Sequence, residues 1–351
     1  MRAIREAGID NQILVLLAAA GALMASLGIR PYLPEHFLWD DGLLELTIHG
    51  GSLVDEAESF ERVGHLYALA GLGEAPPLAA LLGVALYCSG ILLAVGWERT
   101  ARLSMPSLLV TMAFFVPALA YLAQYSKELV TLGVAMLVVV IPDGRGRLST
   151  AMGELAVIGG ALAYGATLRP YWLIIAVMYI GWRILLPRTA HPLLLVALPA
   201  AAYAVLQPLF QAVLGHGLQG AREWSNAERA GEQVNTLIQS VAPDARGALG
   251  VLAALAMLAL MVVPVQLLVS GDAFHLASGI AIVVVWALVL VPVLGGRFVG
   301  ARSPRATRAA SLLLAFLVVQ ALFEPDYGSA LKHLTPLLPL VLMVHLHRGR
   351  S

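Results

Sequence analysis

The chain has 351 residues, of which 59% are hydrophobic and 13% charged, and its mean hydropathy is +0.82. A soluble protein of this length needs far more polar surface, so the composition indicates an integral membrane protein. The formal net charge of zero argues against a nucleic-acid-binding protein that depends on a basic field. The single cysteine, Cys88, excludes an intramolecular disulfide and a cysteine-based metal site.

Apolar runs follow one another along the whole chain, and no hydrophilic linker separates a soluble domain from them. Several runs are shorter than the ~20 residues of a full crossing, so their ends extend into the flanking segments. We therefore expect one transmembrane domain over 1–351, an all-α polytopic helical bundle of ten or eleven spans. The runs lie near 12–29, 78–96, 105–123, 129–141, 151–167, 170–187, 191–213, 248–270, 275–294, 310–323 and 334–346.

The distribution of basic residues predicts the orientation of these helices, because cytoplasmic loops carry an excess of Lys and Arg. Arg2 and Arg5 place the N-terminus in the cytoplasm, and the first run is interpreted as a retained signal-anchor helix. The loop at about 30–77 has nine acidic residues and only Arg30 and Arg62, so it is expected to be periplasmic. Every second loop is basic, through Arg99 and Arg102, Arg145 and Arg147, and Arg188.

Beyond residue 213 the orientation has two solutions. If 248–270 and 275–294 both cross, the basic segment 297–308 falls on the periplasmic side, against the rule. If the run that contains Pro264 is re-entrant instead, the basic segment returns to the cytoplasm. A second periplasmic loop is expected at about 214–247. Its apolar positions recur near helical spacing and predict an amphipathic helix on the membrane or over a cavity, or an ordinary packed loop helix: Trp224, Ala227, Ala230, Val234, Leu237 and Ile238.

Adjacent carboxylates follow the first span in the motif Trp39-Asp40-Asp41-Gly42. Burial and a like-charged neighbour raise the pKa of one member of such a pair, so either carboxylate is a candidate general base. The alternative is an exposed acidic loop.

Cations stand at three further membrane boundaries on the same predicted side. Lys127 and Arg169 precede the runs at 129–141 and 170–187. Lys332 and His333 precede the last run, and Ser329 is expected to cap that helix and place both in its first turn. No metal-ligand spacing or Walker A loop is present, so no metal or cofactor is expected.

A cation at a helix start is slightly unfavourable, by ~0.3–1 kcal/mol, because the helix dipole is already positive there. An anion among the three helix starts would reverse this penalty, since cations and free N–H groups would converge on it. A phosphate or diphosphate at the level of the lipid headgroups fits. The alternative is that these side chains snorkel to the interface.

Three motifs together resemble the O-antigen polymerase-like group of GT-C type glycosyltransferases. They are Ser126-Lys127-Glu128, the R-P-Y-W helix start at 169–172, and FEPDYGSALKHLTPLLPL at 323–340. The resemblance is strongest over 120–190 and 310–345. Polymerases of this kind are often longer, with larger periplasmic loops, so a single-sugar transferase stays open.

The resemblance implies a helical GT-C type fold in a bacterial inner membrane, acting at the periplasmic face on undecaprenyl-linked glycan donors and acceptors. It implies neither nucleotide nor metal. A chain-length regulator is a conceivable protein partner. The implied site holds the lipid diphosphate through Lys127, Arg169, Lys332, Tyr171 and Ser329, and supplies the acid or base from Asp40, Asp41, Glu324, Asp326 or His333.

A transporter or flippase of lipid-linked glycans is the second hypothesis. It would use the same cations for binding alone and would carry ionisable residues near the middle of its spans. The apolar runs are almost free of charge, which favours an enzyme. A non-catalytic assembly partner would leave the outer cations without a role.

Overall fold

The computed structural model describes residues 2–51, 57–142, 147–189, 191–215, 217–228, 236–300 and 303–347. It is all-helical, with 77% helix. No strand occurs in these ranges, where the only β-type pairing is an isolated bridge between Leu237 and Asp326. The expected all-α fold class is confirmed. Each of the eleven predicted apolar runs lies in one helix or in consecutive helices.

Four helices in the described part are long and apolar enough to cross a membrane. They are α4 (Pro76–Val95), α11 (Leu194–Leu214), α15 (Ala273–Leu294) and α16 (Pro304–Phe323). Five shorter apolar helices accompany them. Any number of crossings above four stays a prediction. The break expected at Pro264 is present, because α13 (Gly247–Val262) ends before it and α14 (Val265–Leu268) follows it.

The chain forms two compact units. The first comprises Met1–Trp172 and Lys332–Leu346, and the second comprises Leu173–Leu331 and His347–Ser351. Helices α10 (Tyr171–Leu185) and α17 (Tyr327–Leu334) carry the chain from one unit to the other.

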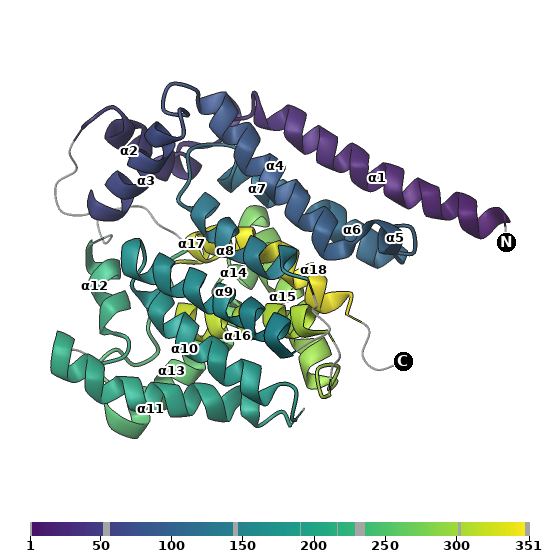
Figure 1. Cartoon of the computed structure of the whole chain (residues 1–351). Coiled ribbons are helices and arrows are strands. Elements are labelled where there is room, and N and C mark those ends of the chain that lie inside the picture. Colours follow the sequence, from purple (N-terminus) through teal and green to yellow (C-terminus); the bar gives the residue numbers. More distant parts are fainter. Residues whose placement is uncertain are drawn as a thin grey trace. The chain divides into compact units, whose positions relative to one another are not determined.

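The first unit contains most of the short helices. Helix α1 runs beside α4, and α18 packs on α4 and α8 (Figure 1). A Cβ on Gly83 of α4 would lie 2.5 Å from the Leu122 carbonyl oxygen, so only glycine permits this approach. The elements of this unit are α1 (Arg2–Ser26), η1 (Arg30–Tyr32), η2 (Glu35–Phe37), α2 (Trp39–Ile48), α3 (Ala57–Leu69), α4, α5 (Trp97–Thr100), α6 (Met105–Ala113), α7 (Phe115–Tyr121), α8 (Glu128–Val140), α9 (Arg147–Thr167), η3 (Thr335–Leu337) and α18 (Leu338–His345).

The predicted periplasmic loop at 30–77 contains two helices, α2 and α3, that pack on each other. The buried apolar face of these helices is not evident from the sequence, because acidic residues interrupt the apolar positions of the segment. Its core residues come from both helices and from later parts of the unit: Leu44, Phe60, Val63, Tyr67, Ala79 and Tyr125. Asp40 and Asp41 lie in the first turn of α2.

The second unit is built around α13 and α16. Helix α13 packs against α11 and α16, and α12 (Gly220–Glu228) also contacts α16. In the membrane-length window of α16, 94% of the residues are buried. A helix is present in the second loop over Gly220–Glu228, where Trp224 is exposed, but the prediction is wrong at Leu237 and Ile238, which lie outside a helix because this segment pairs with the backbone at Pro325 and Asp326. Ala230 and Val234 of that prediction lie outside the described residues, as do Arg145 and Arg302 of the basic loops.

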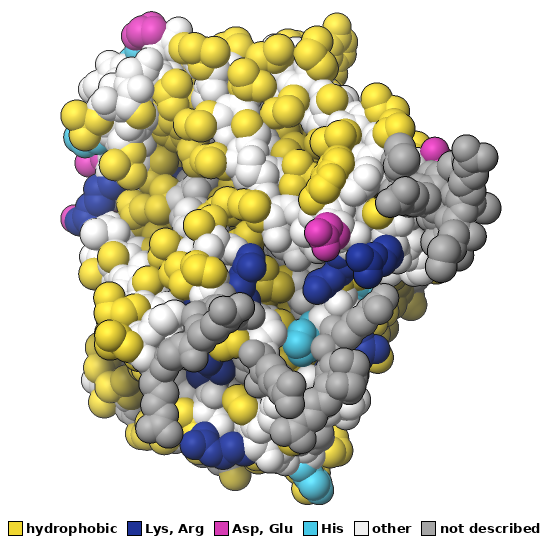
Figure 2. All heavy atoms as spheres, turned by 45° about the vertical axis from the view of Figure 1, so that its right-hand side comes forward, with side chains coloured by type: hydrophobic (Ala, Val, Ile, Leu, Met, Phe, Trp, Pro, Cys, Tyr) yellow, Lys and Arg dark blue, Asp and Glu magenta, His cyan; other side chains and the backbone are white. Residues whose placement is uncertain are grey.

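The surface has the character expected of a protein in lipid. On the face that Figure 2 shows, hydrophobic side chains cover wide areas and charged side chains form small groups. Along α4, Leu82, Leu86 and Leu93 share one helix face and are exposed, whereas Cys88 is buried. A row of exposed leucines on a membrane-length helix is stabilised by lipid rather than by water.

Candidate functional site

The start of α2 holds the first part of a charged cluster in the first unit. Asp40 lies in the first turn of α2, where the helix dipole favours a carboxylate. Its Oδ2 atom lies 2.7 Å from the Nζ atom of Lys332 in α17. The pair joins residues 292 positions apart in the chain, and both side chains remain partly exposed.

Glu128 is the buried centre of the cluster. It opens α8 and has no exposed side-chain area. Its Oε1 atom accepts a hydrogen bond of 2.6 Å from Nη2 of Arg169 and lies 3.5 Å from Nε2 of His333. Arg169 also donates from Nη1 to the Tyr171 hydroxyl at 3.2 Å. Charge-assisted hydrogen bonds of this kind hold the cationic side chains in fixed positions.

Lys127 precedes Glu128 and is the N-cap residue of α8. Its Nζ atom lies 3.3 Å from the centre of the Phe60 ring, a cation–π contact. Among the described residues, no carboxylate lies within ion-pairing distance of this amine. Lys127 is therefore held in place by an aromatic face, which leaves its charge available to an anion.

Tyrosines of the first unit hold the segment that carries Lys127. The Tyr67 hydroxyl donates to the Ser126 carbonyl oxygen and accepts from the Ser126 N–H, each at 3.1 Å. The Tyr125 hydroxyl contacts the carbonyl oxygens of Leu72 and Gly73 at 2.7 Å. These contacts tie the start of α8 to α3 and to the turn after it, so Lys127 sits on a rigid support.

The charges of the cluster act on one another. Burial raises the pKa of Asp40, but the charges on Lys332, Lys127 and Arg169 outweigh it and hold the pKa well below its usual value. Burial lowers the pKa of Lys127 to about 7, with Asp40 opposing this shift and Arg169 and Lys332 adding to it. Lys127, Arg169 and Lys332 thus face Asp40 and Glu128, so three positive side chains meet two negative ones.

Asp41 faces away from this cluster. It is buried, and its carboxylate accepts hydrogen bonds from Arg30 Nε at 2.7 Å and from the Tyr125 N–H at 2.9 Å. Arg30 also pairs with Glu45 at 2.5 Å. Asp41 therefore fastens α2 to the segment that leads into α8. The two adjacent carboxylates have different roles, since Asp40 faces the cations and Asp41 holds the backbone.

Glu324, Asp326 and Ser329 lie in the second unit. The Ser329 N–H donates to Oδ1 of Asp326 at 2.7 Å, and the Glu324 carbonyl oxygen accepts from Arg222. The prediction that Ser329 caps the last helix is wrong. Asp326 does so one turn earlier, and α17 begins at Tyr327. Lys332 and His333 consequently lie in the last turn of α17 rather than the first turn of a new helix.

The geometry expected from the sequence thus holds for two of the three cations. Lys127 and Arg169 stand at the starts of α8 and α10, whereas Lys332 reaches the cluster from the end of α17. Glu128 was not predicted as a site residue, although it belongs to the motif Ser126-Lys127-Glu128. The available signal was its position, because an acidic residue that opens an apolar helix beside a cation needs a partner.

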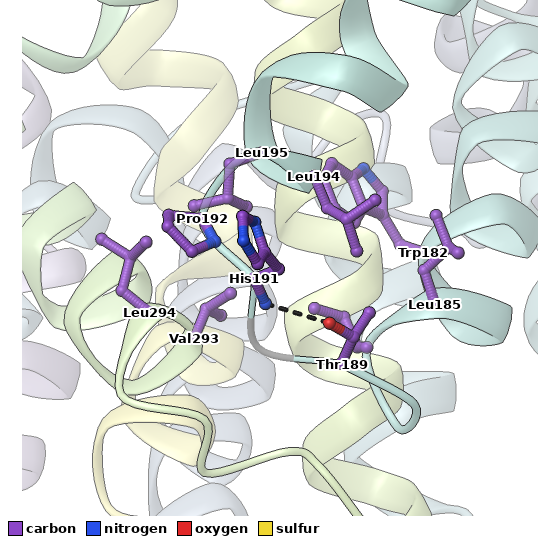
Figure 3. Close-up of a pocket in the computed structure, with 10 residues that line it drawn as sticks. Trp182, Leu185, Thr189, His191, Pro192, Leu194, Leu195, Val293 and Leu294 are labelled. Carbon is purple, nitrogen blue, oxygen red and sulfur yellow. Dashed lines mark hydrogen bonds between the residues drawn. The ribbon is translucent and has the colours of Figure 1, made fainter.

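A pocket in the second unit offers different chemistry. It lies where α10 ends and α11 begins, beside Val293 and Leu294 of α15, and Figure 3 shows its largely apolar lining. Its polar residues are Trp182, Thr189 and His191, and the His191 N–H donates to the Thr189 hydroxyl at 3.1 Å. Such a lining provides no cluster of cations for a phosphate.

Comparison with protein-family models, with curated proteins and with solved structures finds no match to this chain. In the described residues, no group of three or more His, Cys, Asp or Glu side chains is placed to hold a metal ion. The functional argument therefore rests on the chemistry of the charged cluster.

Proposed function

We propose that the chain is a membrane glycosyltransferase or polymerase of cell-surface polysaccharide biosynthesis. It uses undecaprenyl-(di)phosphate-linked sugar donors at the periplasmic face of a bacterial inner membrane, with its N-terminus in the cytoplasm. The observation that carries the proposal is the excess cation, Lys127, on a Phe60 ring beside Asp40, Arg169 and Lys332. That the donor carries a sugar is inferred from the resemblance of the motifs around these residues to those of the O-antigen polymerase-like group.

In this proposal the three cations bind the phosphate of the donor. The hydroxyl oxygen of the acceptor attacks the anomeric carbon, and the bond between that carbon and the phosphate oxygen breaks. Lys127, Arg169 and Lys332 stabilise the negative charge that develops on the leaving phosphate. Asp40, the carboxylate of the cluster that remains partly exposed, accepts the hydroxyl proton once the phosphate of the donor offsets the cations that hold its pKa low.

Glycan transport without transfer is the competing function. The four membrane-length helices contain no Asp, Glu or Lys, and their only Arg residues, Arg305 and Arg308, lie within the first two turns of α16. A translocation pathway for a charged lipid is expected to carry ionisable residues at membrane depth. The position of charge at helix ends supports a reaction at the interface.

The test is an assay of purified protein in lipid nanodiscs with an undecaprenyl-linked oligosaccharide. Lys127→Ala and Asp40→Asn are each expected to lower the rate of glycosidic bond formation by roughly 100- to 1,000-fold. Arg62→Ala is the matched control, since Arg62 is an exposed cation of the predicted periplasmic loop at 30–77 that also contains Asp40. Equal amounts of product from the wild type and all three variants would show that the charged cluster is not the active site. Translocation of the lipid that depends on Lys127, with no new glycosidic bond, would establish transport instead.

A further inference from the structure

Unpaired polar atoms gather in the second unit, outside the charged cluster. Gln207, Gln219 and Gln320 are at most 4% exposed, and Arg222 has no exposed area. Each of these four side chains has at least one buried nitrogen or oxygen atom without a hydrogen-bond partner in the described part of the chain, and so do the half-buried Asn226 and Ser240. The atoms concerned are Nε2 and Oε1 of Gln207, Oε1 of Gln219, Nη1 of Arg222, Oδ1 of Asn226, Oγ of Ser240 and Nε2 of Gln320.

Arg222 of α12 joins this group to the end of α16. Its Nε and Nη2 atoms donate to the carbonyl oxygens of Glu324 and Ala321 at 2.8 and 2.6 Å. The guanidinium thus donates hydrogen bonds to the free carbonyl groups at the C-terminus of α16. Its third nitrogen atom, Nη1, has no hydrogen-bond partner in the described part of the chain. Gln320 lies in the last turn but one of the same helix, and Gln219 immediately precedes α12. Helices α12 and α16 contact each other.

The remaining members are tied to the same place by hydrogen bonds and close contacts. Asn226 donates from Nδ2 to the Ile238 carbonyl oxygen at 3.2 Å, and Ser240 follows two residues later. The Ile238 N–H donates to the Pro325 carbonyl oxygen at 2.7 Å, directly after the end of α16. Gln207 of α11 lies beside both Gly217, near the start of α12, and Gly250 of α13. We call these six residues the amide cluster.

The balance of donors and acceptors in the amide cluster indicates what it binds. Three orphaned nitrogen atoms donate, three orphaned oxygen atoms accept, and the Ser240 hydroxyl does both. Reversing the Gln207 side chain leaves this balance unchanged, because both of its amide atoms are unpaired, and Asn226 is fixed by the hydrogen bond from its Nδ2 atom. A phosphate satisfies donors only, and an ammonium group satisfies acceptors only. A hydroxyl group donates and accepts at the same atom.

We propose that the amide cluster binds the hydroxyl groups of a neutral carbohydrate. Buried polar groups are costly unless they are paired, so a cluster of this size points to a ligand with matching groups. The binding reaction does not depend on the proposed transferase function.

Access to the amide cluster requires a movement of the chain, since its atoms are shielded from solvent. Helix α12 supplies Arg222 and Asn226 and is nine residues long. Its displacement from α16 would expose the cluster, and association that waits for such a movement is slow. A low association rate is therefore part of the proposal.

The experiment measures binding of methyl glycosides of glucose, galactose, mannose and N-acetylglucosamine to the full-length protein in nanodiscs, by saturation-transfer NMR and calorimetry. At least one glycoside is expected to bind with a dissociation constant of about 1 mM, the range typical of a ligand of this size. Gln207→Met and Gln320→Met remove amide groups at nearly constant volume and should weaken binding about tenfold each, without lowering the melting temperature. Gln211→Met is the matched control, because Gln211 is an exposed residue of α11.

Binding that is lost in the two buried variants and kept in Gln211→Met supports the proposal. No binding by any neutral glycoside overturns it, and so does binding that all variants share. Binding of glucuronate alone also overturns it, because that result assigns the cluster to an anion held by Arg222. No lipid phosphate enters this assay, so its failure leaves the transferase proposal standing. Loss of transfer in Lys127→Ala with intact glycoside binding would affect only the transferase proposal.

Discussion

Two buried arginines, one in each unit, are compensated in different ways. Arg169 of the first unit pairs with the carboxylate of Glu128 at 2.6 Å. Arg222 of the second unit donates to the main-chain carbonyl oxygens that end α16. Burial lowers the pKa of both guanidinium groups. Glu128 outweighs this effect and raises the pKa of Arg169, whereas Glu324 does not outweigh it at Arg222, whose pKa falls to about 10.

The difference separates an electrostatic site from a hydrogen-bonding one. A carboxylate compensates a buried cation fully, and neighbouring charges can then be arranged around the pair. Carbonyl dipoles compensate it only in part, and the charge of Glu324 adds to them without restoring the pKa of Arg222. The first unit thus compensates its buried cation with an ion pair, and the second mainly with main-chain dipoles.

Removing Arg169 tests this contrast most severely. Arg169→Met leaves Glu128 charged and buried, so the free energy of unfolding should fall by about 3–5 kcal/mol. The double variant Arg169→Met with Glu128→Gln should recover most of the loss, because the uncompensated charge is gone. Reversible unfolding in mixed micelles measures both. A loss in the single variant no larger than in the double variant would contradict the pairing.

Arg222→Met should cost less, about 1–3 kcal/mol, since the contacts it removes are hydrogen bonds to main-chain carbonyl groups rather than an ion pair. Arg246→Met is the matched control, because Arg246 is an exposed arginine of the same unit and should change stability little. The same unfolding measurement applies. A loss equal to that of Arg169→Met would end the distinction between the two arginines.

Lys127 predicts how binding of an anion depends on pH. Its pKa of about 7 means that the amine loses its proton as the pH rises above 7, and its attraction for a phosphate falls with it. Farnesyl phosphate, which is doubly ionised above pH 7, should bind about tenfold more weakly at pH 9 than at pH 7. Lys127→Arg keeps its charge over this range, so its affinity should be flat. Equal slopes in the two proteins would assign the titration to another group.

The smallest effect is expected at Tyr171. Tyr171→Phe removes the hydroxyl that accepts from Arg169 Nη1, but Glu128 still holds the guanidinium. The affinity for farnesyl phosphate should change by less than about threefold, in keeping with the loss of one neutral hydrogen bond. Tyr32→Phe, at an exposed tyrosine, serves as the reference. A loss of more than tenfold would place Tyr171 on the phosphate itself.

The fold class and the places of the helices could be predicted because hydrophobicity along the chain determines both. The break at Pro264 is an example, since proline acts on its own backbone. Helices α2 and α3 were missed because their apolar faces are short and interrupted by acidic residues. In these cases, the information needed lies in contacts between segments distant in sequence.

The candidate site shows the same division at the level of single residues. Lys127 and Arg169 were found because each stands next to an apolar run. The adjacent carboxylates Asp40 and Asp41 could not be separated, since only the packing of α2 decides which one faces the cations. Asp326 and Ser329 are both good capping residues, and the start of α17 depends on a fold that neither reveals alone.

The pairing of Asp40 with Lys332 has a consequence for how the protein is made. The first unit closes only when a segment 292 residues downstream of Asp40 returns to it. During synthesis, the ribosome translates residues 173–331 of the second unit while the charged cluster still lacks Lys332 and His333. A chain interrupted before α17 would enter the membrane with Asp40 and Glu128 incompletely compensated, and cellular proteases would have an exposed, unstable region to recognise. Competence to hold a phosphate is thus acquired only after residues 173–331 of the second unit have been made.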